Sequence, residues 1–124
     1  MGAQGIARSG VPEQRTPGFW NNVSVCCGNA GVSDFFVSLH DVLGDAAHLA
    51  YAERVARDTL RRATRDAAGM RWVQAEHRTQ PALLVAQTGY MQGAAGVGTS
   101  MLRLDAALQG RAMAARLPDT PFER

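Results

Sequence analysis

One short motif occurs twice in this chain, and that repeat constrains the fold more than any other feature. The stretch Gly28-Asn29-Ala30-Gly31-Val32 returns as Gly93-Ala94-Ala95-Gly96-Val97, 65 residues further along. Each copy opens a run of apolar residues at helical spacing, and the similarity continues into those runs. We therefore predict a duplicated unit in which the same turn leads into an equivalent helix. Glycine suits such a turn because it tolerates positive φ and close backbone approach.

The first copy predicts a hairpin of two helices. Apolar residues over 31–43 indicate a short, mostly buried helix, and Gly44 stands where a C′ glycine would end it. Asp45 is placed to cap a second helix over 46–68, which has an apolar stripe, a charged face and Gly69 at its end. Three oppositely charged pairs on that face have i,i+4 spacing: Glu53 with Arg57, Arg54 with Asp58, and Asp58 with Arg62. A buried helix followed by an amphipathic one predicts an antiparallel pair of inner and outer helices.

The helical pattern is interrupted before the second copy of the motif. The pattern over residues 70–87 is compatible with a short β-hairpin. The spacing does not distinguish a strand from a helix in the apolar run that starts at Pro81. The second inner helix is then predicted to begin at Tyr90 or Gly93 and to end at Gly110.

The two ends of the chain have a different composition. Residues 1–18 lack periodicity and predict a loop or flexible N-terminal arm, so that 19–124 form the folded portion. Two prolines exclude a helix over 117–122.

Charge and cysteine content exclude several classes of function. The net charge is only +2, every basic residue is an arginine, and acids are interleaved with the bases. Aromatic residues make up 6% of the chain, too few for the stacking surfaces of single-strand binders, so we expect no nucleic-acid partner. No secretory signal or membrane-spanning run is present, and two cysteines cannot form a disulfide framework. These features predict a soluble protein in the reducing cytoplasm.

Cys26 and Cys27 precede only the first copy of the motif. They stand at the mouth of the predicted inner helix, where unpaired N–H groups favour the thiolate and hence binding of a soft metal. Catalytic zinc usually takes three protein ligands, so this pair supplies most of a site but not all of it. On spacing alone, the favoured alternative is a pair of buried free thiols that pack as small apolar groups.

A family resemblance bears on that choice. The stretch Ser24-Val25-Cys26-Cys27-Gly28-Asn29-Ala30-Gly31 resembles the Cys-His-Gly-x-Ala-Gly motif of the LanC-like lanthionine cyclases. Residues 89–98 resemble the last turn of these proteins, and residues 117–122 are similar to their C-terminal end. The similarity spans residues 19–122 but covers only the C-terminal part of a family domain. It implies an all-α fold, a partial α/α toroid of helical hairpins with inner and outer helices.

The resemblance also implies a function. LanC-like cyclases hold one zinc ion that activates the cysteine thiol of a peptide for addition to dehydroalanine or dehydrobutyrine, which gives a thioether ring. Cys26 matches the cysteine ligand of the motif, and Cys27 stands where most members have a histidine; a Cys-Cys-Gly variant is known among peptide-cyclising relatives. The implied partner is a peptide with cysteine and dehydrated Ser or Thr. An upstream domain or a second protomer would complete the toroid.

The chain departs from the family in ways that leave alternatives open. It has no third cysteine for the upstream zinc ligand, and the family's acid and base residues also lie upstream, so we assign no catalytic residue and expect an incomplete enzyme. Three histidines are candidate substitutes but more typical of ordinary packed or exposed residues: His40, His48 and His77. A non-catalytic helical interaction module without the full metal site is the main alternative. A glycosidase of another toroid class is the least favoured, and it would use three carboxylates: Asp34, Asp41 and Asp45.

Overall fold

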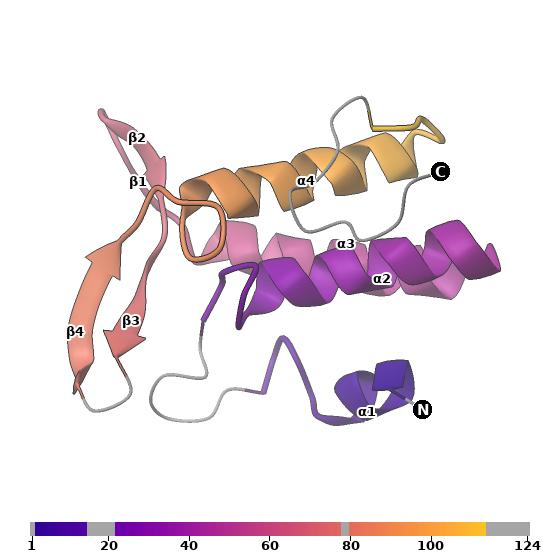
Figure 1. The fold of residues 1–124 in the computed structure, drawn as a ribbon, viewed down its shortest axis with the longest axis horizontal. Coiled ribbons are helices and arrows are strands. Elements are labelled where there is room, and N and C mark those ends of the chain that lie inside the picture. The colour runs from indigo at the N-terminus through magenta and orange to yellow at the C-terminus, as the bar shows by residue number, and fades with distance from the viewer. Residues whose placement is uncertain (1, 15–21, 78–79, 114–124) are drawn as a thin grey trace.

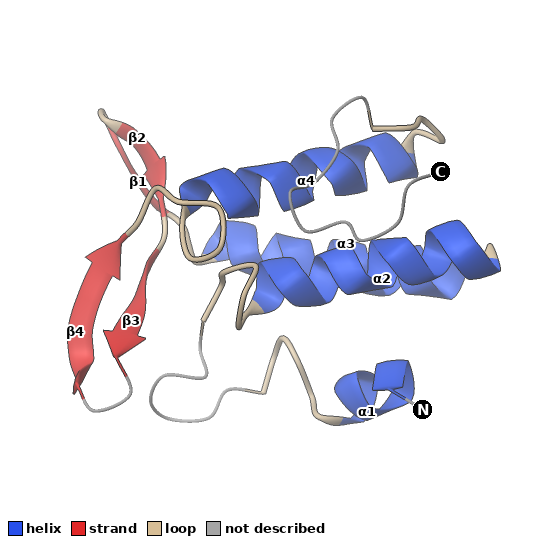
Figure 2. Ribbon diagram, viewed as in Figure 1, coloured by secondary structure: helices blue, strands red, loops and turns tan. Residues whose placement is uncertain are grey.

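The computed structural model describes residues 2–14, 22–77 and 80–113. Within these ranges the chain forms four helices: α1 (Gly2–Arg8), α2 (Asn29–Leu43), α3 (Ala46–Arg61) and α4 (Ala94–Leu108). It also forms four strands: β1 (Thr64–Asp66), β2 (Gly69–Arg71), β3 (Val73–His77) and β4 (Gln80–Ala86). The strands pair as two antiparallel hairpins at one end of the helices (Figure 2). The predicted helical class is confirmed.

The three long helices pack against one another, with α3 behind α2 and α4 in the view of Figure 1. α2 and α3 run antiparallel as a hairpin, while α4 lies beside them and runs in the direction of α2 (Figure 1). A buried hydrogen bond connects α2 with each neighbour: Ser33 donates to the Ala52 carbonyl at 3.1 Å, and Ser100 donates to the Ala30 carbonyl at 3.0 Å. α2 and α4 are therefore equivalent inner helices, and α3 is the outer helix of an arc of an α/α toroid.

The ends of the first helical hairpin are set by the residues that the sequence indicated. Gly44 follows α2 with a φ of 70°, in the left-handed region that favours glycine. The carboxylate of Asp45 accepts the Ala47 N–H at 2.8 Å and caps α3. The prediction that α3 continues to Ala68 is wrong, because the helix ends at Arg61.

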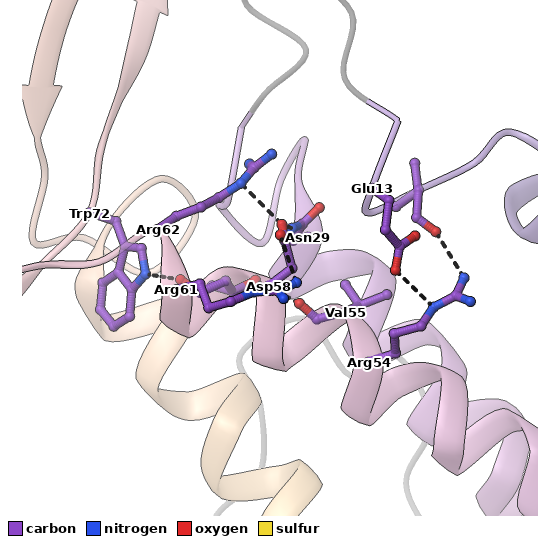
Figure 3. Close-up of polar contacts among 10 residues, drawn as sticks. Glu13, Asn29, Arg54, Val55, Asp58, Arg61, Arg62 and Trp72 are labelled. Atoms are coloured by element: carbon purple, nitrogen blue, oxygen red, sulfur yellow. Dashed lines mark hydrogen bonds and ion pairs between the residues drawn. The ribbon is translucent and has the colours of Figure 1, made fainter.

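The early end of α3 has a physical cause. The Trp72 indole N–H donates to the Thr59 carbonyl at 2.8 Å, in the last turn of the helix (Figure 3). The chain after Arg61 then folds back, and Gly69 takes a φ of 121° in the β1–β2 hairpin instead of ending a helix. Burial of Trp72, which is only 7% exposed, thus outweighs the local helical tendency of residues 62–68.

Two of the three predicted ion pairs on α3 form. Arg57 lies 2.5 Å from Glu53, and Arg62 lies 3.0 Å from Asp58. Arg54 instead pairs with Glu13, at 3.4 Å (Figure 3). The cause is that the N-terminal segment lies against α3. The i,i+4 spacing within a helix gives no information on such a contact.

The N-terminal segment also carries a helix, α1, where the sequence predicted a loop. Ile6 of α1 packs against the core cluster around Phe36. Further along, the Tyr51 hydroxyl donates to the Val11 carbonyl at 2.6 Å and Pro12 is buried. These contacts with α2 and α3 supply the order that the short Gly2–Arg8 sequence lacks by itself. The division of the chain into an arm at 1–18 and a toroid portion at 19–124 stays a prediction.

The region between the two copies confirms the predicted β-hairpin. β3 pairs with β4 in the register Val73 with Ala86 and Ala75 with Leu84, so the run from Pro81 is a strand. The second inner helix forms as predicted, and Gly110 follows it with a φ of 64°. The segment 117–122 lies outside the described residues. In the part of the chain that is described, no helix is both long enough and apolar enough to cross a bilayer.

Burial along α2 is less complete than the sequence suggested. The first half packs tightly, with Phe36 only 3% exposed and Val37 only 1%. The C-terminal end projects beyond its neighbours, and Val42 and Leu43 are exposed. The contacts of α2 therefore concentrate at the end that carries the cysteine turn.

Candidate metal centre

The two glycine turns have the same backbone structure. In the first turn, the Gly28 N–H donates to the Ser24 carbonyl at 3.1 Å, and in the second the Gly93 N–H donates to the Gly89 carbonyl at 2.9 Å. The next two N–H groups of each turn donate to equivalent carbonyls as well: Asn29 to Asn22, Ala30 to Val23, Ala94 to Gln87 and Ala95 to Thr88. The two copies of the motif, 65 residues apart in the sequence, therefore share the same backbone hydrogen bonds. These bonds satisfy the first N–H groups of α2 and α4, which no helical carbonyl can reach.

Close backbone approach explains the glycines of these turns. Gly28 has a φ of −144° and Gly93 a φ of −128°, so positive φ is not the reason for glycine there. A Cβ on Gly31 would overlap the Val25 carbonyl, and a Cβ on Gly96 would overlap the equivalent Tyr90 carbonyl. The first turn of each inner helix thus lies directly on the chain segment that precedes it.

The two turns also contact each other. The Cys26 N–H donates to the Met91 carbonyl at 3.0 Å, and these two residues occupy equivalent positions of the repeat. The Val25 side chain packs toward Gly96, where an added Cβ would come within 2.8 Å of it. The second copy therefore holds the cysteine turn in place. Sequence reasoning missed Met91, although the repeat itself contained the signal, because neighbouring repeats place equivalent positions side by side.

The thiols of Cys26 and Cys27 both face solvent. Their Sγ atoms lie 2.9 Å apart, and the Cys27 N–H donates to the Ser24 hydroxyl at 3.3 Å. The alternative of two buried thiols is therefore wrong, since both cysteines are exposed. Beside them lies an open cavity of about 290 Å³. Its other lining residues are apolar: Ile6, Val25, Gly28, Gly31, Val32 and Phe35.

The pKa of Cys26 differs from the expectation based on the helix dipole. The hydrogen bond between the two sulfurs, with smaller effects from desolvation and from the charge of Cys27, raises the pKa of Cys26 above its usual value of 9.0. Cys26 precedes the N-cap residue Gly28 by two positions, and its own N–H is directed to Met91. The contact with the neighbouring sulfur therefore raises the pKa of Cys26, whereas the helix dipole alone would lower it.

The geometry of the pair agrees with metal chelation after a small movement. Two sulfurs on a tetrahedral zinc ion, each about 2.3 Å from the metal, lie about 3.8 Å apart. The sulfurs of this site lie closer than that, at 2.9 Å, so a bound ion would separate them by roughly 1 Å. Rotation of two exposed side chains is enough for this change.

A third protein ligand is not brought to the pair by the described residues. Among them, no three His, Cys, Asp or Glu side chains gather in a way that could hold a metal ion. His40 lies 11 residues beyond the start of α2, about 16 Å along the helix, and its ring contacts the Asp45 carbonyl at 3.1 Å. His48 packs on the Phe36 ring, with the centroids 5.8 Å apart, and His77 lies in β3.

The carboxylates of the glycosidase alternative have structural roles. Asp34 lies 2.8 Å from Arg103 of α4, and Asp41 lies 3.1 Å from the same guanidinium. Burial disfavours the charge on Arg103, but hydrogen bonds and the charges of these two carboxylates outweigh it and raise the pKa of Arg103 above its usual value. The ion pairs of Asp34 and Asp41 connect α2 with α4, and Asp45 caps the start of α3. These structural roles account for the three carboxylates without a glycosidase activity.

Comparison with known proteins agrees with the repeat and with the packing of the three long helices. Curated proteins and solved structures yield no match to this chain. The family model described as lanthionine synthetase C-like protein matches residues 13–112, a span that includes both glycine turns and the three long helices. The chain therefore belongs to the lanthionine synthetase C-like family.

Proposed function

We propose that this chain carries two ligands of a zinc site that serves lanthionine formation. The observation that carries the proposal is the pair of exposed thiols, 2.9 Å apart, on a glycine turn at the start of an inner helix. Membership of the lanthionine synthetase C-like family supports the assignment. The sequence around the pair also resembles the zinc-binding motif of these proteins. Cys26 and Cys27 are the residues that would hold the ion.

The proposed reaction joins a cysteine thiol of a peptide to a dehydroalanine or dehydrobutyrine of the same peptide. Zinc would supply Lewis acidity that lowers the pKa of a thiol, and a sulfur donor at position 27 in place of histidine would leave that thiol more nucleophilic. The turn contributes rigidity, since the Cys26 N–H donates to the Met91 carbonyl and the Cys27 N–H donates to the Ser24 hydroxyl. Val32 and Phe35 line an apolar cavity beside the two cysteines.

The described residues supply no general acid or base for this reaction. Cys26 and Cys27 are the titratable groups among the described residues that line the cavity. The proton that the product carbon requires would come from solvent or from a residue outside those that line the cavity. We infer that an upstream domain or a second protomer completes both the ligand set and the acid–base set.

Zinc titration of the purified chain tests the ligand assignment. We expect weak binding, with less than one zinc per chain at equimolar metal, because two thiolates form a poorer site than three protein ligands. Cys26→Ala and Cys27→Ala should each abolish it, whereas Gln92→Ala, at the position equivalent to Cys27 in the second turn, should not. A tightly held ion that survives both cysteine substitutions would refute the assignment.

Replacement of Cys27 by histidine gives a second test. Cys27→His restores the residue that most family members have, so metal binding should persist while the reactivity of the bound thiol changes. Alkylation of a cysteine peptide, followed by mass spectrometry with and without zinc, measures that reactivity. Loss of all zinc from a folded Cys27→His chain would contradict the alignment of the motif.

A second candidate function rests on a different observation. The described residues gather no third ligand around the pair, and this favours a helical interaction module that keeps the toroid packing without the complete metal site. The zinc titration distinguishes the two candidates. A folded chain that binds no zinc, alone or with an added LanC-like upstream domain, would support the interaction module.

A further inference from the structure

The same thiol pair is built for a second kind of chemistry, one that requires no metal. Its sulfurs are already in contact, at 2.9 Å, and both are exposed to solvent. The backbone at Cys26 is held by Met91, and the Cys27 N–H is held by the Ser24 hydroxyl. The two thiols are therefore held close together on a hydrogen-bonded turn.

The surroundings of the pair leave few competing reactions. The cavity of about 290 Å³ beside the sulfurs admits a small oxidant, and the described residues that line it carry no amine or carboxylate. Each thiol therefore has the other as its nearest reaction partner. A thiol held in contact with an oxidised sulfur captures it at a high effective concentration, before a second oxidant molecule arrives.

We propose that Cys26 and Cys27 are a reversible oxidation site that closes into a vicinal disulfide under peroxide and reopens under a dithiol. One thiol releases its proton to solvent, and the resulting thiolate attacks hydrogen peroxide to give a sulfenic acid and hydroxide. The hydroxide takes up a proton from solvent to form water. The second thiol then attacks the sulfenic sulfur, forms the S–S bond and releases a second water. Two thiols lose two electrons and two protons, and one peroxide becomes two waters.

The closed form is expected to be easily reduced. A disulfide between adjacent residues closes a ring of eight atoms, a strained geometry, and strained disulfides are the labile and regulatory ones. The regulatory consequence rests on the proposed function, since a disulfide sulfur no longer offers a thiolate to zinc. The oxidation chemistry itself rests on the thiol pair alone, so the two ideas can fail separately.

Mass spectrometry of the full chain tests the proposal. The metal-free protein is treated with one equivalent of hydrogen peroxide, and the remaining thiols are blocked with N-ethylmaleimide. We expect the monomer to lose two hydrogens and to bind no maleimide, and then to bind two maleimides after dithiothreitol. The yield should be one disulfide per peroxide consumed.

Matched variants separate the vicinal reaction from ordinary thiol oxidation. Cys26→Ser and Cys27→Ser should each give sulfenic acid, which dimedone traps, or disulfide-linked dimers, and neither should lose two hydrogens. The native chain should close about tenfold faster than the urea-unfolded chain, in which the same two cysteines are adjacent but no longer held in contact. Sulfinic acid or linked dimers as the main products of the native chain, or equal rates when folded and unfolded, would overturn the proposal.

A measurement of zinc binding on the same samples distinguishes failure of the zinc-ligand assignment from failure of the oxidation site. We expect the oxidised chain to lose the zinc binding of the reduced chain and to recover it after dithiothreitol. A vicinal disulfide that forms without any change in zinc affinity would refute Cys26 and Cys27 as ligands but support the oxidation site. Zinc binding that requires both thiols, in a chain that forms no vicinal disulfide, would do the reverse.

Discussion

Substitution of Gly31 by alanine should destabilise the protein by displacing the segment on which the cysteine turn depends. Gly31 lies in the first turn of α2, where alanine would otherwise add about 1 kcal/mol of helix propensity. Its Cβ would overlap the Val25 carbonyl, a backbone atom that cannot rotate away. Overpacking of this kind costs about 1–3 kcal/mol, and more where backbone must move, so we expect a net loss of about 2 kcal/mol.

Gly98 provides the matched control for this substitution. It lies one turn into α4, and a Cβ there would meet no atom within 4 Å. Gly98→Ala should therefore stabilise the chain by about 0.5–1 kcal/mol through propensity alone. Urea unfolding followed by far-UV circular dichroism measures both changes, provided that the slope of the transition stays constant. Equal stability of the two variants would refute the close-approach explanation of the glycine turn.

Three further predictions concern the core, a buried charge and pH. Val37→Ala should destabilise the chain by about 2 kcal/mol in urea, whereas Leu102→Ala at the equivalent position of α4 should change stability by less than about 0.5 kcal/mol, because Val37 is 1% exposed and Leu102 is 65% exposed. Asp58→Ala should lower the free energy of unfolding by about 3 kcal/mol, since it removes the buried carboxylate that Asn29 and two arginines contact. Asp105→Ala, at an exposed ion pair, should leave the free energy of unfolding nearly unchanged in the same assay. A hydrogen bond from Arg71, with a smaller effect of the hydrogen bond from the Ala68 N–H, lowers the pKa of Asp66. The ionised Asp66 should therefore stabilise the β1–β2 hairpin fully above the unfolded pKa near 4. This stabilisation should be lost as the pH falls through the lower pKa of the folded state. Amide exchange of that hairpin at low salt should show this loss, and Asp66→Asn should remove the pH dependence.

Local signals predicted the helices well because their ends depend on neighbouring residues. Gly44 ends α2, Asp45 caps α3, and the apolar spacing of α2 and α4 follows from the sides that they bury. The end of α3 could not be predicted in this way. It depends on Trp72, which reaches back to the Thr59 carbonyl from a segment whose position is set by the core.

The candidate site shows the same division between local and long-range causes. The cysteine pair and its turn were visible in the sequence, but exposure of the thiols was not, because it depends on where the turn lies relative to α1 and α4. The direction of the Cys26 pKa depends on a sulfur–sulfur contact that spacing alone does not determine. The N-terminal helix was missed for a related reason, since its order comes from packing of Ile6 and hydrogen bonding of Val11, both distant in sequence from their partners.

The contact between Cys26 and Met91 leads to a last prediction, which separates the backbone of the second turn from its side chains. Met91 acts on the site through its carbonyl, which accepts the Cys26 N–H at 3.0 Å, while the residue is 48% exposed. Met91→Leu should therefore change neither stability, beyond about 0.5 kcal/mol, nor the rate at which the thiols react with N-ethylmaleimide. Gly93→Ala should change both, because a Cβ there would overlap the carbonyl group of Gln87 and displace the second turn. If Met91→Leu slowed the thiols as much as Gly93→Ala does, the methionine side chain itself would belong to the site, and the second copy of the motif would contribute chemistry as well as support.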